Sequence, residues 1–145
     1  MDNTYRIKSI KTPIEIQQCW EVASLLRPHL HKDKWSTTIA KMMQSEKYRI
    51  AGIMDEEKVV AFAGYRQMTS LHSGNILYID DLCTLASYRG KGLGSQLLAH
   101  IRAIALSQEM DAVVLDTDFH NSTAQKLYLK NGFQFAAVHL ISRLK

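Results

Sequence analysis

Apolar residues recur along the chain at two spacings, and the longer spacing predicts four helices. Intervals of three and four, typical of a helix that buries one face, extend over residues 13–28, 35–43, 93–105 and 122–131. Pro13 suits the first position of a helix, and Gly132 suits the position just after a helix end.

Shorter apolar stretches bounded by polar turns predict strands. They lie at residues 5–10, 48–54, 59–66, 76–85, 112–115, 133–135 and 138–141. The second and third are separated only by a polar turn at residues 55–58, which predicts a hairpin. An antiparallel meander followed by a strand-helix-strand unit indicates an α/β fold with a mixed sheet. The length predicts a single domain over residues 1–145.

Composition places the chain among ordinary globular proteins, with 46% hydrophobic and 22% charged residues. The two cysteines, Cys19 and Cys83, form neither a disulfide framework nor a CxxC zinc pattern, so we expect a reducing compartment and no metal. No apolar stretch approaches the ~20 residues that a membrane span needs. Met1–Arg6 is not followed by the apolar segment of a signal peptide. We therefore expect a cytoplasmic protein without a membrane partner.

The net charge of +4 and the pI of about 9.1 permit an anionic ligand. The basic residues are scattered, and no recognition helix or aromatic-basic pattern accompanies them. We therefore expect no nucleic-acid partner.

A glycine-rich loop lies between a predicted strand and a predicted helix. Glycines let backbone N–H groups approach a ligand, and a helix start adds unpaired N–H donors, so the loop predicts an anion site. The Walker and dinucleotide patterns are absent, whereas R-x-x-G-x-G fits. The loop consists of Arg89, Gly90, Lys91, Gly92, Leu93, Gly94 and Ser95.

Here the sequence resembles the GNAT superfamily of acyl-CoA-dependent N-acetyltransferases. The resemblance rests on Asp81-Leu82-Cys83-Thr84, on the segment from Tyr88 to Leu98, and on the N-x-x-A-x-x-L-Y-x-x-x-G-F block from Asn121 to Phe133. It covers roughly residues 76–135. It implies a mixed, mostly antiparallel sheet of about six to seven strands flanked by helices, with a V-shaped splay between the fourth and fifth strands.

The resemblance also implies how acetyl-CoA, the co-substrate, would bind. The loop from Arg89 to Ser95 would hold the pyrophosphate, and the pantetheine arm would pair with Leu82, Cys83 and Thr84. A backbone N–H near Leu82 or Cys83 would polarise the thioester carbonyl. In relatives, Asn121 reaches the coenzyme; a helix cap is the alternative role, and both can coexist.

The chemistry implied is attack of a neutral amine on the acetyl thioester. Tyr128 matches the family's general acid for the leaving thiolate, and Ala124, one turn earlier, would leave room at the thiol. The base is open between Asp81, Asp80 and ordered water. A regular strand would point these two carboxylates to opposite faces, whereas a bulge, frequent in the family at this point, would change that. The alternative is a structural role, such as pairing with Arg66.

The acceptor is a small-molecule amine or a peptide, and the sequence does not name it. Arg27, His29 and His31 are candidate acceptor contacts, and Tyr65 and Arg66 are alternatives. Aspartates could also make the cleft acidic and suited to a cationic amine; they are Asp80, Asp81, Asp116 and Asp118. A non-catalytic acyl-CoA-binding sensor is the alternative function. A homodimer through the last strands is compatible with the resemblance.

Overall fold

The computed structural model describes residues 5–145, which divide into two compact units. The first ends at Leu115, and the second is Asp116–Lys145. The first unit is built on a five-stranded sheet in the order β1-β2-β3-β4-β5. Its strands are β1 (Tyr5–Ile10), β2 (Tyr48–Asp55), β3 (Lys58–Ser70), β4 (Gly74–Thr84) and β5 (Ala112–Leu115). The N-terminal segment in which we expect no signal peptide includes residues 1–4, which lie outside the described residues.

The first four strands pair antiparallel, and β5 pairs parallel with β4. This confirms the mixed, mostly antiparallel sheet. The predicted hairpin is β2–β3, whose turn uses Glu56 at a φ of 56°. The last β4–β5 pair is Ile79 with Leu115, so β4 from Asp80 to Thr84 continues without β5 alongside it. The resemblance places the splay at this point.

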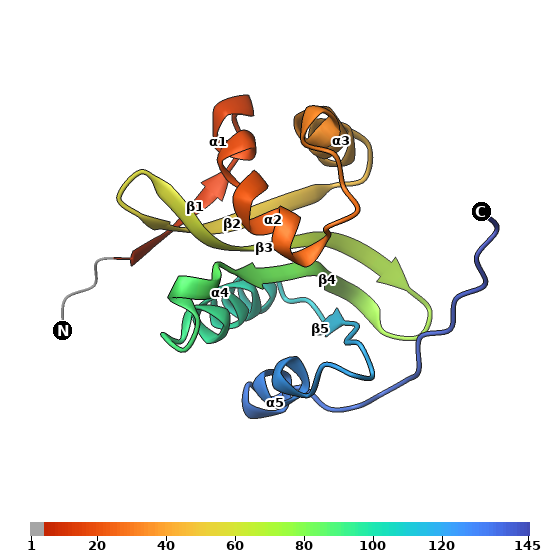
Figure 1. The fold of residues 1–145 in the computed structure, drawn as a ribbon. Coiled ribbons are helices and arrows are strands. Elements are labelled where there is room, and N and C mark those ends of the chain that lie inside the picture. Colours follow the sequence, from red (N-terminus) through yellow and green to blue (C-terminus); the bar gives the residue numbers. More distant parts are fainter. Residues whose placement is uncertain (1–4) are drawn as a thin grey trace. The chain divides into compact units, whose positions relative to one another are not determined.

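Helices cover both faces of the sheet (Figure 1). On one face lie α1 (Pro13–Gln18), α2 (Trp20–Leu26) and α3 (Lys32–Ser45), and on the other lies α4 (Leu93–Ser107). A short 3-10 turn, η1 (Ala86–Tyr88), precedes α4. Because both faces are covered, residues 59–65 of β3 are all buried.

The first predicted helix, residues 13–28, is in fact two helices that meet at Cys19. The indole of Trp35 on α3 donates a hydrogen bond to the carbonyl of Ile16 at 2.8 Å. The Cys19 N–H bonds to the same carbonyl at 3.1 Å, three residues back, which tightens the turn. A side chain from a distant helix therefore accompanies a break that local spacing did not predict.

The second unit contains α5 (Ser122–Lys130), which ends one residue before the predicted bound and is followed by Asn131 and the predicted Gly132. Gly132 has a φ of 89°, and the N–H groups of Gly132 and Phe133 bond back to Leu129 and Tyr128. The strands predicted at 133–135 and 138–141 are absent, so the described residues hold five strands rather than six or seven. A strand needs a partner for its backbone groups, and the second unit contains no other strand.

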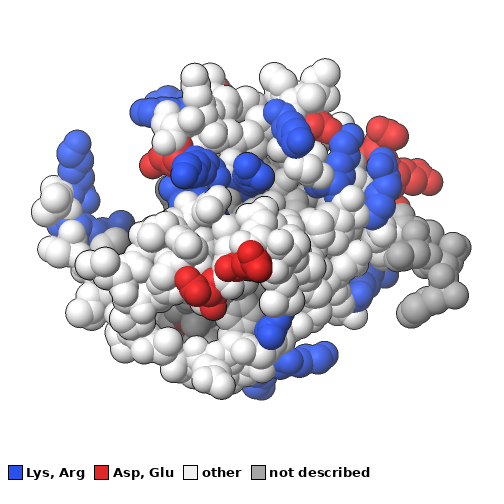
Figure 2. Space-filling model, turned by 180° about the vertical axis from the view of Figure 1, so that it is seen from behind, with Lys and Arg blue, Asp and Glu red and all other residues white. Residues whose placement is uncertain are grey.

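The helices and the surface charge of the described residues also bear on the expectations from the sequence. None of their helices is both long and apolar enough to cross a membrane. On the face shown in Figure 2, Lys and Arg side chains stand in several separate groups, with uncharged surface and acidic side chains between them. This distribution agrees with the scattered basic positions in the sequence.

Candidate active site

The glycine loop leads into α4 as the sequence predicts. Gly90 and Gly92 both have a φ of 79°, in the left-handed region that favours glycine. A Cβ at either position would meet nothing within 4 Å. These glycines are therefore required by backbone conformation rather than by crowding, and the space beside them is open to a ligand.

The N-terminus of α4 has features that suit an anion. Gly92 is the N-cap, no side chain caps the helix, and its first turn carries no acidic residue. Arg89 and Lys91 are exposed in the same loop, and Arg89 Nε also donates to the Thr84 carbonyl at the end of β4. The loop therefore combines a helix start without a side-chain cap, the positive end of a helix and two cations, which suits a phosphate group.

A tyrosine at the end of η1 fixes this loop to the first two strands. The Tyr88 hydroxyl donates to Asp55 Oδ2 at 2.6 Å, and its ring meets the edge of Tyr5. The hydrogen bond to Asp55, with a smaller effect of burial, raises the pKa of Tyr88 to about 12. These two contacts fix Tyr88, the residue just before the loop, against β1 and β2.

The end of β4 carries the residues expected to meet the pantetheine arm. Leu82, Cys83 and Thr84 pair with β3 on one side, and β5 does not reach them on the other. Burial raises the pKa of the Cys83 thiol, which therefore stays protonated at neutral pH. This favours a packing role for Cys83 and leaves the backbone of the strand as the feature to contact a ligand.

A β-bulge lies at the two aspartates. Gly64 of β3 pairs with Asp81, whereas the next residue, Tyr65, pairs with Ile79, so Asp80 is the extra residue on β4. The side chains of a bulge do not alternate regularly. The contacts of Asp80 and Asp81 show that both carboxylates lie on the face of the sheet that carries the Tyr48 ring.

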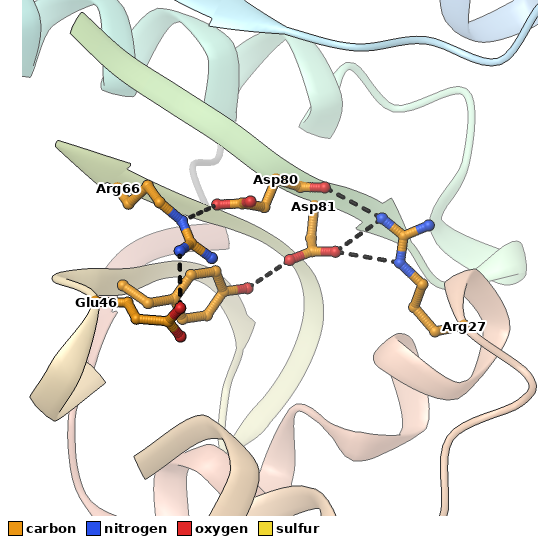
Figure 3. A network of polar contacts seen from close by, with 6 residues as sticks. Arg27, Glu46, Arg66, Asp80 and Asp81 are labelled. Carbon is orange, nitrogen blue, oxygen red and sulfur yellow. Dashed lines mark hydrogen bonds and ion pairs between the residues drawn. The ribbon is translucent and has the colours of Figure 1, made fainter. Parts of the chain in front are cut away.

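The two carboxylates belong to one polar network (Figure 3). Asp81 accepts a hydrogen bond from the Tyr48 hydroxyl at 2.7 Å and pairs with Arg27 at 3.1 Å. Asp80 accepts from Arg66 Nε at 2.9 Å, and the Arg66 guanidinium lies over the Tyr48 ring. The pairing of Asp80 with Arg66 was one alternative from the sequence, whereas Asp81 has different partners.

Burial raises the pKa of two groups in this network, Asp80 and Tyr48. It raises the pKa of Asp80, against the opposing effect of Arg66. It also holds the pKa of Tyr48 well above 10, and the adjacent Asp81 carboxylate adds to this effect. Tyr48 is therefore a permanent donor to Asp81 at neutral pH.

A pocket of about 310 Å³ opens beside Asp81, between α2, α3 and the sheet. Its lining includes Arg27, His29 and His31, which the sequence suggested as acceptor contacts, but not Tyr65, Arg66 or Asp80. Sequence reasoning did not single out the other lining residues, among them Lys34, Trp35 and Tyr48.

A glycine inside a strand was the available signal for Tyr48. Such a glycine often marks a close approach by another group. At Gly64 a Cβ would overlap the Tyr48 hydroxyl. The absence of a side chain at Gly64 therefore lets Tyr48 reach Asp81.

The remaining predicted residues belong to the second unit. Asn121 caps α5 by accepting from the Ala124 N–H at 3.0 Å, which is the alternative role expected for it. Ala124 and Tyr128 lie one turn apart on α5, and the Tyr128 ring packs edge-on against Phe133. Burial raises the pKa of Tyr128, so its phenol is protonated at neutral pH and able to donate.

The comparison with known families decides what kind of protein this is. The model of a family described as "Acetyltransferase (GNAT) family" matches residues 15–133. The chain belongs to the GNAT acetyltransferase family. The match includes the glycine loop, both aspartates and α5, and so extends well beyond the blocks that carried the resemblance.

Two bacterial proteins named as N-acetyltransferases are similar to this chain over different shares of its length. The "Uncharacterized N-acetyltransferase YhdJ" of Bacillus subtilis (strain 168) is 27% identical over 128 residues, which cover 88% of this chain and 90% of that protein. Another from the same organism, YycN, is 36% identical over 73 residues, or 50% of this chain and 47% of that protein.

Solved structures of aminoglycoside acetyltransferases share the fold. AAC(6')-Iy in complex with CoA has a TM-score of 0.84 at 16% identity, covering 96% of this chain and 93% of that one. The enzyme meta-AAC0020, from an uncultured soil metagenomic sample and in complex with sisomicin, has a TM-score of 0.84 at 16% identity, with 99% of each chain covered. At these identities the likeness concerns the GNAT fold.

Proposed function

We propose that this protein transfers an acetyl group from acetyl-CoA to a primary amine by direct attack in a ternary complex. The observation that carries the proposal is the loop from Arg89 to Ser95, with two left-handed glycines beside open space and an uncapped helix start. These features fit the pyrophosphate of coenzyme A. The complexes of similar folds with CoA and with sisomicin agree with a coenzyme and a small-molecule acceptor.

The reaction needs two proton transfers. The amine nitrogen attacks the thioester carbonyl carbon, the new C–N bond forms, and the C–S bond breaks with its electron pair left on sulfur. In our proposal Tyr128 gives its proton to that sulfur, and the N–H near Leu82 or Cys83 stabilises the carbonyl oxygen. The proton lost by the amine goes to a base.

Asp81 is the better candidate for that base, directly or through a water. Its carboxylate lines the pocket, whereas Asp80 is absent from the lining and is bound to Arg66. Tyr48 and Arg27 hold the Asp81 carboxylate in place. These contacts already occupy both oxygens of that carboxylate, so a water chain with no dedicated base is the alternative route.

Calorimetric titration with acetyl-CoA and CoA, followed by thiol release on a panel of amines, tests the function. We expect binding and turnover. Binding without turnover on any amine would favour the sensor, and absence of binding would overturn the proposal.

Two glycine variants make the test specific to the loop. Gly92→Ala forces a side chain into a left-handed conformation, at a cost of roughly 1–2 kcal/mol, and should weaken acetyl-CoA binding about tenfold. Gly74→Ala is the control, because Gly74 has a similar φ of 82° but lies at the opposite end of β4 from Thr84. It should lower stability without changing acetyl-CoA affinity.

We also propose that the protein forms a homodimer through residues 133–145. Five large apolar side chains are exposed in this segment, which has no regular structure; they are Phe135, Val138, Leu140, Ile141 and Leu144. A run of exposed apolar residues with strand propensity favours pairing with another chain.

A further inference from the structure

The pocket beside Asp81 has a charge pattern that restricts the acceptor. The lining contains two basic side chains, Arg27 and Lys34, and one acidic side chain, Asp81. Arg27 is already paired with Asp81 at 3.1 Å. Lys34 has no ion-pair partner among the described residues. The uncompensated charge in the lining is therefore positive and comes from α3.

We propose that the acceptor is an amino-acid-like amine that carries a carboxylate on an apolar body. This inference rests on the proposed function and specifies its second substrate. The carboxylate would lie against Lys34, with His29 and His31 from the same wall as further donors. The amine would then lie toward Asp81, where the proposed base is.

The size and the remaining lining of the pocket fit such a molecule. A volume of about 310 Å³ is at the lower end for small-molecule sites. Apart from the charged and histidine side chains, the walls are mainly apolar or aromatic and include Trp35, Phe62 and Ile39. One apolar side chain of amino-acid size would fill this space.

The same pattern disfavours a polycationic acceptor. Additional ammonium groups would face Lys34 and Arg27, and like charges at short range are repulsive. The acidic cleft considered from the sequence does not form at Asp80 and Asp81, because each carboxylate is paired with an arginine. A second positive group in the acceptor thus finds no unpaired carboxylate in this pocket lining.

Binding of product-like probes tests the inference without requiring turnover. The probes are the N-acetyl derivatives of leucine, methionine, phenylalanine and tryptophan, each compared with its carboxamide. Affinities are measured by calorimetry with CoA present at saturation. We expect at least one carboxylate to bind about tenfold or more tightly than its carboxamide, equivalent to roughly 1.4 kcal/mol.

Matched lysine variants assign the preference to the pocket. Lys34→Gln should reduce the carboxylate preference to within about twofold, as expected when the unpaired lysine charge of the pocket lining is removed. Lys41→Gln is the control, because Lys41 is an exposed lysine on the same helix that does not line the pocket. It should leave the preference unchanged.

Three binding results would each overturn the inference: equal affinity for carboxylates and carboxamides, no measurable binding of any carboxylate, or an unchanged preference in Lys34→Gln. Failure of the proposed function would be seen separately, as absence of acetyl-CoA binding. Thiol release with spermidine that exceeds release with all four parent amino acids would also reject the inference while supporting acetyl transfer.

Discussion

The Tyr48 side chain links the two aspartates of the bulge, although it comes from a strand that is not adjacent to theirs. Its hydroxyl holds Asp81 and its ring lies beneath Arg66, which holds Asp80. Tyr48 is at the start of β2, and β3 lies between it and β4. The orientation of both carboxylates therefore depends on one buried ring.

The first prediction at this scale concerns Tyr128 as the acid. Tyr128→Phe keeps the ring that packs on Phe133 but removes the proton donor. Turnover should fall by roughly 100-fold or more, because general acid catalysis contributes about that amount. Acetyl-CoA affinity, measured by calorimetry on the same sample, should be nearly unchanged. Unchanged turnover would exclude Tyr128 as the acid.

The two aspartates should differ in their effects on catalysis. Asp81→Asn should lower kcat by about 100-fold, because it removes the carboxylate that lines the pocket. Asp80→Asn should cost less than about tenfold, because Asp80 positions Arg66 rather than facing the pocket. Steady-state thiol release at saturating acetyl-CoA measures both. Equal and negligible losses would support a water route with no dedicated base.

The close approach of Tyr48 to Gly64 predicts strong coupling between these positions. Gly64→Ala should destabilise the protein by about 1–3 kcal/mol, because its Cβ overlaps the Tyr48 hydroxyl. In a Tyr48→Leu background the same substitution should cost less than about 1 kcal/mol, since the ring is gone. Urea unfolding of the four proteins of this cycle measures the difference. Additive effects would contradict the proposed steric cause.

At the scale of elements, local signals identified most of the first unit. The β2–β3 hairpin, α4 and β5 were predicted because each depends on its own periodicity and turn residues. The division between α1 and α2 was not, because it involves an indole from α3 bonded to Ile16. The side of the sheet reached by Asp80 was also open, because it depends on the register between β3 and β4.

The start of α1 gives a prediction about pH. Glu15 forms a capping box with Thr12 and an ion pair with Lys8 at 2.6 Å. The bond from Lys8 and those from the backbone of Thr12 and Lys11 lower the pKa of Glu15 to about 2. The ionised form thus stabilises the fold above the ordinary pKa of 4.5, and this contribution is lost as the pH falls toward 2.

Glu15→Gln isolates that charge, because glutamine keeps a capping oxygen. It should lower the free energy of unfolding by about 1 kcal/mol at pH 7, and the difference should shrink steadily below pH 5, as urea unfolding would show. Glu21→Gln is the control, because Glu21 is exposed and its Oε2 lies 3.9 Å from Lys58 Nζ, a long ion pair on the surface. A Glu15 effect that does not change with pH would refute the assignment.

At the scale of the whole molecule, the apolar pattern at residues 133–141 identified segments that favour strands but not their partner. Strand formation requires a second edge, and sequence periodicity contains no information about where that edge is. In the candidate site, too, local signals identified some residues and missed those that depend on packing. Its loop residues were recognised from spacing, whereas Lys34 and Trp35 entered the site only through the packing of α3.

The proposed dimer can be tested by sedimentation. The full chain should sediment at twice its 16.5 kDa mass, and a chain that ends after residue 135 should sediment as a monomer. The paired substitution Leu140→Ser and Ile141→Ser should have the same effect without shortening the chain, because it removes two exposed apolar groups. A full-length monomer at all accessible concentrations would disprove the dimer.

The missing side chain at Gly64 also restricts how this protein can change over evolutionary time. A descendant that acquires a side chain at position 64 is destabilised while the tyrosine at position 48 is kept, since a Cβ at 64 and the end of that side chain occupy the same space. Losing that ring removes the donor to Asp81 and the surface beneath Arg66. Among related sequences, glycine at 64 should therefore accompany tyrosine at 48, and the two positions should be replaced together.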